Sequence, residues 1–126
     1  MYNTMKLLVA VLFIKMAGIA DVIKLALKKF MPKIEIAFIY GSLARGEELS
    51  TSDVDLMLIG NIKLADLATT LKTAEQNIGR EINPTIYSPA EFIRKERELD
   101  SFLKTVVKNK KIFLKGTEVE IKALAG

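Results

Sequence analysis

The sequence predicts an α/β fold in which helices pack on a small sheet. Apolar runs of strand length end at glycine or contain a proline, and segments with apolar residues at helical spacing lie between them. Strands and helices therefore alternate along the chain. With 126 residues, of which 50% are apolar and 27% charged, the chain has the size and composition of a globular domain. We expect a single domain over residues 1–126.

The first element is expected to be an amphipathic helical region within residues 1–31. Apolar residues recur there at helical spacing with charged residues opposite, Gly18 is a point where the helix can break, and Pro32 ends the region. The apolar run 7–14 loosely resembles a secretory signal, but Lys15 interrupts it before any cleavage-like site. The run is also too short to span a bilayer. We therefore predict a cytoplasmic protein without membrane association.

Four segments have the pattern of strands. Residues 33–41 alternate and then become continuously apolar, and residues 53–60 form a second apolar run, as is typical of largely buried strands. Residues 80–87 are a third strand, in which Pro84 should lie at an edge or bulge because it cannot donate a ladder hydrogen bond. A short strand is expected at 111–116.

Helical patterns fill the intervals between the strands. Residues 42–52 predict a turn or short helix followed by a polar loop, and 63–79 a helix that stops at glycine. A helix that opens at Ser88 has this residue as N-cap, Pro89 at its first position and Glu91 at N3. The remaining helices are expected at 100–110 and 117–126.

Composition excludes several classes of site. The chain has no cysteine, which excludes disulfides and thiolate metal sites, and no histidine, which excludes Ser-His-Asp and Cys-His catalysis. The net charge of +4 is mild, and Lys and Arg are scattered, whereas a nucleic-acid platform would have a denser basic stripe. Any chemistry must therefore come from Asp, Glu, Lys, Arg, Ser or Tyr.

The stretch YGSLARGEELSTSDVDLMLIG contains the candidate site. Gly41 permits close backbone approach, and the amides of the following turn can form an anion-binding concavity to which Ser42 adds a hydroxyl. Asp53 and Asp55 are two residues apart, which places both on one face of a strand. Two adjacent carboxylates are costly without a cation, and their hard oxygens suit Mg²⁺ or Mn²⁺. A phosphate cradle opposite a carboxylate pair outlines a nucleoside triphosphate site.

Other interpretations of this stretch explain less of it. A P-loop needs a lysine and a hydroxyl residue after its last glycine, and an EF-hand needs polar ligands beyond Asp55, where an apolar run follows. A glycosidase carboxylate pair would leave the Gly-Ser turn unexplained. An isolated Asp-x-Asp would favour a structural interpretation, in which Asp53 caps a turn and Asp55 is a solvated strand-end residue.

The spacing resembles the signature of the DNA polymerase β-like nucleotidyltransferase superfamily, in particular its minimal archaeal and bacterial members. A Gly-Ser step, ten intervening residues and Asp-Val-Asp carry the resemblance, which GIADVIKLAL, GREINPTIYSPAEF and KKIFLKG extend over residues 10–126. The resemblance implies a mixed sheet with helices on one face, and two divalent ions between enzyme and triphosphate.

The resemblance also assigns roles to residues of the motif. It implies that Asp53 and Asp55 are catalytic metal ligands and that Gly41 and Ser42 contact phosphate. Arg45 lies in the same turn region, where it is either a further phosphate contact or a solvated surface arginine.

The sequence departs from the resembled pattern at the third carboxylate. Counting back from YSPAEF, Asn83 occupies the position where the family has a base or metal ligand near the attacking hydroxyl. An asparagine carbonyl can coordinate a cation but cannot accept a proton. Glu81 is a candidate catalytic residue, because in a regular strand it would share the face of Asn83. The simpler interpretation of Glu81 is an exposed edge-strand glutamate.

The resemblance implies a magnesium-dependent nucleotidyltransferase that moves a nucleoside monophosphate from an NTP, with ATP favoured, to a hydroxyl acceptor such as a protein. The alternative is a weak or silent binding module, the antitoxin or regulatory partner of a small helical protein, which Asn83 and the small size favour. The resembled members often carry an N-terminal winged-helix region that binds DNA. Too few residues precede Gly18 for such a region, so we expect no sequence-specific DNA binding by this chain alone. The apolar N-terminal helix suggests a protein partner or a homodimer.

Overall fold

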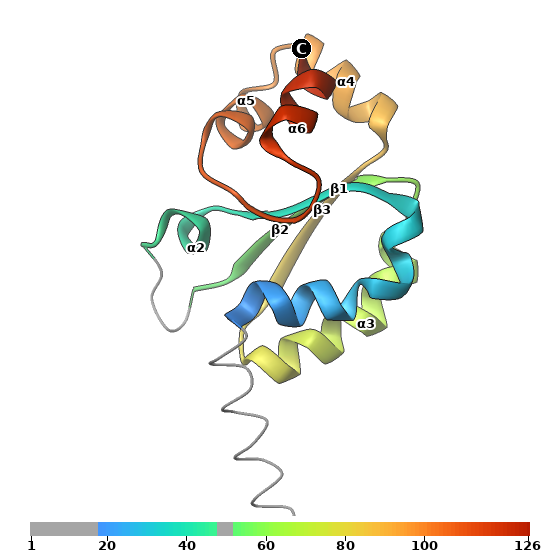
Figure 1. Cartoon of the computed structure of the whole chain (residues 1–126), viewed down its shortest axis with the longest axis vertical. Coiled ribbons are helices and arrows are strands. Elements are labelled where there is room, and N and C mark those ends of the chain that lie inside the picture. Colours follow the sequence, from blue (N-terminus) through green and yellow to red (C-terminus); the bar gives the residue numbers. More distant parts are fainter. Residues whose placement is uncertain (1–17, 48–51) are drawn as a thin grey trace, which may run out of the picture.

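A computed structural model describes residues 18–47 and 52–126, which form one sheet with helices packed on both faces (Figure 1). In chain order the elements are a helical segment at 18–26, η1 (Lys28–Lys33), β1 (Ile34–Tyr40), α2 (Ser42–Arg45), β2 (Val54–Gly60), α3 (Leu64–Ile78), β3 (Ile82–Tyr87), α4 (Pro89–Arg97), α5 (Ser101–Lys108), β4 (Ile112–Lys115) and α6 (Glu118–Ala125).

The sheet has the strand order β3-β2-β1-β4. Strand β1 runs antiparallel to β2 and β4, whereas β2 and β3 are parallel, so the sheet is mixed and the predicted fold class is confirmed. Pro84 lies in the edge strand β3, as its missing backbone donor requires. The parallel pair matters for the site, because it places the beginnings of β2 and β3 side by side.

The two central strands are buried on both faces, and each face has its own helical cover. On one face the helical segment 18–26 and α3 pack against alternate residues of β1 and β2, including Ile39 and Leu56. On the other face α4, α5 and α6 cover Phe38 and Met57 (Figure 1). The expectation of helices on one face is therefore wrong. A continuously apolar strand exposes apolar side chains on both sides, and both sides must be covered.

The N-terminal helical region ends differently from the prediction. Its α-helical part stops at residue 26, and Pro32 lies inside the 3-10 helix η1 instead of terminating the region. In η1 the amide of Phe30 donates to the Leu27 carbonyl at 2.9 Å. A short 3-10 turn tolerates a proline near its end because few of its amides need a partner within the helix. The expectations for residues 1–17 lie outside the described residues.

The predicted capping box at the start of α4 is confirmed. The Ser88 hydroxyl accepts from the Glu91 amide at 3.1 Å, and the Glu91 carboxylate accepts from the Ser88 amide at 3.0 Å. Pro89 occupies the first helical position. This cap turns the chain directly from β3 into the helical layer above the sheet. Across the parts of the chain that are described, no helix has the length and apolar character to cross a membrane.

Candidate functional site

The Gly-Ser turn lies directly against one of the two predicted aspartates. Gly41 connects β1 to α2 with φ 77° and ψ −155°, and its carbonyl accepts from the Arg45 amide at 3.1 Å. A Cβ atom built on Gly41 would collide with a carboxylate oxygen of Asp55. The backbone angles of Gly41 therefore favour glycine, and any other residue there would also have to displace this carboxylate.

Asp53 and Asp55 stand at the beginning of β2. Asp53 immediately precedes the strand and is exposed, whereas Asp55 lies within it and is partly buried. Along β2 the alternate residues Met57 and Ile59 enter the core under α4, α5 and α6, so the carboxylates project from the sheet on that same side. Arg80 donates to the Ser52 carbonyl at 3.2 Å, which holds the backbone just before Asp53.

Asn83 lies beside the aspartates on the neighbouring strand. The parallel register pairs Asn83 with Asp55, and the Asn83 side-chain amide donates to the Asp53 carboxylate at 3.2 Å. Both side chains of this hydrogen bond are exposed. Rotation of the amide group by half a turn would present its carbonyl oxygen where the nitrogen now lies. The structure thus brings the predicted third position to the carboxylate pair.

Glu81 lies at the start of the β2–β3 pairing, two residues before Asn83. It precedes β3 and is exposed, and its backbone carbonyl accepts from the Val54 amide at 2.8 Å. This bond continues the β2–β3 ladder by one residue, so the backbone of Glu81 is held beside the beginning of β2.

Ser42 and Arg45 are the first and last residues of the short helix α2. Ser42 is partly buried next to the Gly41 turn. The Arg45 guanidinium pairs with the Glu47 carboxylate at 3.2 Å, and both side chains are well exposed. An exposed ion pair of this kind is weak, so a phosphate group in the turn would compete for the guanidinium.

Three residues that the sequence did not single out adjoin the site. The Tyr40 hydroxyl lies 3.3 Å from the Thr85 hydroxyl, and the Tyr40 ring is in edge contact with the Phe102 ring, at 5.9 Å between centroids. Tyr40 pairs with Asp55 across the β1–β2 ladder. Burial raises the pKa of the Tyr40 hydroxyl, the hydrogen bond to Thr85 lowers it, and the charge of Asp55 raises it further. No local pattern reveals these contacts, because they join residues far apart in the sequence.

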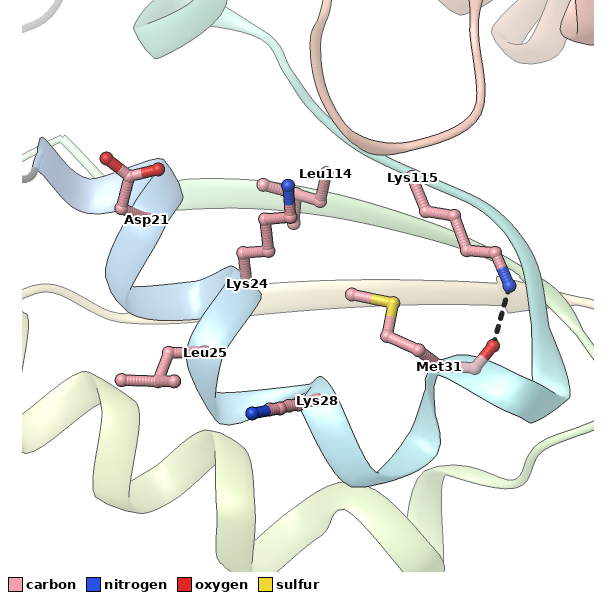
Figure 2. Close-up of a pocket in the computed structure, with 7 residues that line it drawn as sticks. All are labelled: Asp21, Lys24, Leu25, Lys28, Met31, Leu114 and Lys115. Carbon is pink, nitrogen blue, oxygen red and sulfur yellow. Dashed lines mark hydrogen bonds between the residues drawn. The ribbon is translucent and has the colours of Figure 1, made fainter.

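A separate hollow lies on the opposite face of the sheet. It has a volume of about 550 Å³ and lies between the N-terminal helical segment and β4 (Figure 2). Leu114, one of its apolar lining residues, belongs to the core under α3. On one side of the hollow, Lys115 donates to the Met31 carbonyl at 2.8 Å. The lining residues are Asp21, Lys24, Leu25, Lys28, Met31, Leu114 and Lys115. The hollow shares no residue with the carboxylate site, so it does not define where a triphosphate would bind.

The donor set of the carboxylate site fits a hard cation. Asp53 and Asp55 offer carboxylate oxygens, and Asn83 offers an amide oxygen after rotation. Within residues 18–47 and 52–126, no cluster of three or more Asp, Glu, His or Cys side chains is placed to hold a metal ion. A cation at this site would therefore complete its coordination with phosphate oxygens and water, as Mg²⁺ commonly does.

Comparison with known proteins gives a family and a fold. The family model described as polymerase beta, nucleotidyltransferase, matches residues 21–118. No curated protein matches the chain.

Three similar solved structures are toxin–antitoxin complexes. A toxin–antitoxin with AMP-PNP has a TM-score of 0.61 at 16% identity, covering 84% of this chain and 80% of that chain. A mutant MntA toxin–antitoxin, with two Asp-to-Glu substitutions two positions apart, has a TM-score of 0.61 at 14% identity, with coverages of 84% and 80%. The tri-AMPylated HEPN toxin of Shewanella oneidensis in complex with MNT antitoxin has a TM-score of 0.53 at 13% identity, with coverages of 85% and 77%. At these identities the likeness establishes the fold alone.

Proposed function

Because this chain belongs to the polymerase beta nucleotidyltransferase family, we propose that it binds an NTP with a divalent cation and transfers the nucleoside monophosphate to a hydroxyl group. The observation that carries the proposal is the contact between the Gly41 turn and Asp55. It joins a turn suited to phosphate binding to the carboxylate pair, because the Asp55 carboxylate lies where a side chain at position 41 would begin.

The turn would hold the outer phosphates of the triphosphate. Gly41 keeps the backbone open for close approach, and the Ser42 hydroxyl and neighbouring amides donate hydrogen bonds to phosphate oxygens. Arg45 would exchange its exposed partner Glu47 for a phosphate, since a guanidinium binds phosphate through several donors. These contacts orient the triphosphate along the end of the sheet.

The carboxylate pair would hold the cation and with it the reacting phosphate. Asp53 and Asp55 are the ligands, and the Asn83 carbonyl is a neutral third donor. When bound, Mg²⁺ or Mn²⁺ supplies the positive charge that offsets the triphosphate and the departing pyrophosphate.

The transfer itself requires an acceptor that can lose a proton. The acceptor oxygen forms a bond to the α-phosphorus while the bond to pyrophosphate breaks, and the hydroxyl proton leaves to a base. Asn83 cannot take that proton, and the exposed Glu81 is the candidate base in its vicinity. The transfer is therefore expected to be slower than with a carboxylate at position 83.

The acceptor that we favour is a protein hydroxyl, and the nucleotide that we favour is ATP. Similar complexes contain AMP-PNP in one case and a tri-AMPylated HEPN toxin in another. The likeness of fold supports this acceptor class, and a transfer assay tests it directly.

The second candidate function is a nucleotidyltransferase-fold binding module, the antitoxin or regulatory half of a two-protein system. It is favoured by the hydrogen bond between Asn83 and Asp53, because a neutral amide occupies the place of the third carboxylate. Such a module would bind nucleotide and a partner protein but transfer little or nothing.

The test is transfer of label from NTPs carrying a radioactive α-phosphate, in the presence of Mg²⁺ and the protein encoded by the neighbouring gene. Label on that protein supports the transferase, and its absence with NTP still bound supports the binding module. If the chain binds no NTP under these conditions, both candidate functions are contradicted.

A further inference from the structure

Phe102 is an exposed aromatic residue beside the candidate site. Phe102 is 42% exposed, which is more than any other aromatic residue in the part of the chain that the structure describes. It stands near the start of α5, whose residues Leu103 and Val106 are buried in the core. The helix is thus anchored by other side chains, and core packing does not account for an aromatic residue at this position.

Tyr40 fixes the place of the Phe102 ring relative to the site. The two rings meet edge to face, with centroids 5.9 Å apart and planes at 72°. Tyr40 is itself held through its hydroxyl by Thr85, precedes the Gly41 turn, and pairs with Asp55. A chain of contacts therefore connects Phe102 to the residues that would hold phosphate and cation, on the face covered by α4, α5 and α6.

We propose that the Phe102 ring, positioned against Tyr40, is the surface on which the base of the bound NTP stacks. The inference rests on the proposed function, since it extends the phosphate and cation contacts to the third part of the same ligand. Exposed aromatic rings beside a phosphate site bind bases through their π-faces, and such stacking tolerates every base. The platform would therefore add affinity while discriminating little among the four NTPs.

The binding of the phosphates and the binding of the base can be measured separately. Inorganic tripolyphosphate has the phosphates without base or sugar, whereas ATP has phosphates, sugar and base. In titration calorimetry with Mg²⁺, Phe102→Ala should weaken ATP binding by about tenfold and leave tripolyphosphate binding unchanged. Phe102→Trp should retain ATP affinity, because it restores the aromatic face.

A matched control comes from another exposed apolar side chain on a helix. Val119 is 77% exposed on α6, so Val119→Ala should change neither affinity. Unchanged tripolyphosphate binding in Phe102→Ala also shows that the variant is folded.

Three results would overturn the inference. ATP affinity unchanged in Phe102→Ala would show that no base lies on the ring. Equal losses of ATP and tripolyphosphate would show a general effect on the site instead of a base contact. A wild-type chain that binds neither ligand would contradict the proposed function itself, and the inference with it.

Discussion

Position 41 is constrained both by its backbone angles and by the nearby Asp55 side chain. Its φ of 77° is unfavourable for any side chain, and a Cβ would also collide with the Asp55 carboxylate. The collision would displace either the turn or the carboxylate, and the proposed function requires both. Gly41 is therefore the residue at which backbone geometry and site chemistry are most tightly joined.

Gly41→Ala should lower the free energy of unfolding by about 1–3 kcal/mol and abolish measurable Mg²⁺-dependent NTP binding. Gly46→Ala is the control, because Gly46 also has a positive φ, in the left-handed region (φ 74°, ψ 15°) that alanine enters at a smaller cost, and the added atom meets open space. That control should show the backbone cost with nucleotide binding intact. Denaturant titration and calorimetry measure the two effects, and equal behaviour of both variants would refute the close-approach argument.

Asn83 is expected to limit the rate of nucleotidyl transfer from bound NTP. Asn83→Asp should raise nucleotidyl transfer by about a hundredfold with little change in NTP affinity, because a carboxylate there acts where charge changes in the transition state. It also sets a third negative charge beside Asp53, so the variant should be stabilised more strongly by Mg²⁺ than the wild type. Transfer assays and thermal unfolding with and without Mg²⁺ measure both effects.

The control for this prediction is Glu81→Gln. If Glu81 is the base in the wild type, its replacement should remove transfer, and if it is a surface residue, transfer should be unchanged. Robust wild-type transfer that is indifferent to both substitutions would rule out Asn83 as the limiting residue.

Strand β4 and the helices on either side of it depend on one buried lysine. The Lys111 side chain is fully buried, and its ammonium donates to the Val107 and Asn109 carbonyls at 2.7 and 2.8 Å. It also pairs with the Glu118 carboxylate at 2.8 Å. One cation thus satisfies the carbonyls at the end of α5 and connects them to the start of α6.

Lys111→Ala should lower the free energy of unfolding by about 1–3 kcal/mol, because two carbonyls at the end of α5 and the Glu118 carboxylate lose a charged donor. Lys110→Ala changes an exposed lysine next to it and should be nearly neutral. Denaturant titration of the two variants gives the comparison. Equal stabilities would mean that water replaces the ammonium at little cost.

Alkaline pH should lower the free energy of unfolding of the whole domain through the ionisation of its tyrosines. Burial raises the pKa of Tyr40 and of Tyr87 above the ordinary value of about 10. Above pH 10 the unfolded chain loses these protons first, so it binds fewer protons than the folded chain and stability falls with pH. Below pH 10 their contribution is fully present.

Tyr40→Phe should therefore reduce the loss of stability between pH 10 and 11 relative to the loss in the wild type. Its stability at pH 8 will be somewhat lower, because the hydrogen bond to Thr85 is gone. Denaturant titration at the three pH values tests the difference in slope. The same slope in both proteins would show that Tyr40 does not contribute.

The features that sequence could predict are those determined by near neighbours. The Ser88–Glu91 capping box, the order of strands and helices along the chain, and the alternation that puts Asp53 and Asp55 on one face each depend on a few consecutive residues. Family resemblance supplied the mixed character of the sheet. It did not supply the second helical layer, which follows from strands that are apolar on both faces.

The remainder depends on contacts between residues distant in the sequence. The hydrogen bond of Asn83 to Asp53 spans the parallel β2–β3 pair, and the ring contact of Tyr40 with Phe102 connects β1 to α5. Such pairs are created by strand order and helix packing, which no local pattern encodes. The roles of Gly41, Ser42, Arg45, Asp53, Asp55 and Glu81 in nucleotide chemistry stay predictions.

The central claim is that Asp53 and Asp55 hold a cation to which a triphosphate binds, and calorimetric titration with ATP tests it most directly. The wild type should bind ATP with Mg²⁺ and lose binding in excess chelator. The double variant Asp53→Asn with Asp55→Asn should not bind ATP in either condition, and should be as stable as the wild type or slightly more so, since two adjacent negative charges are removed. An unchanged, Mg²⁺-dependent ATP affinity in a folded double variant would contradict the account.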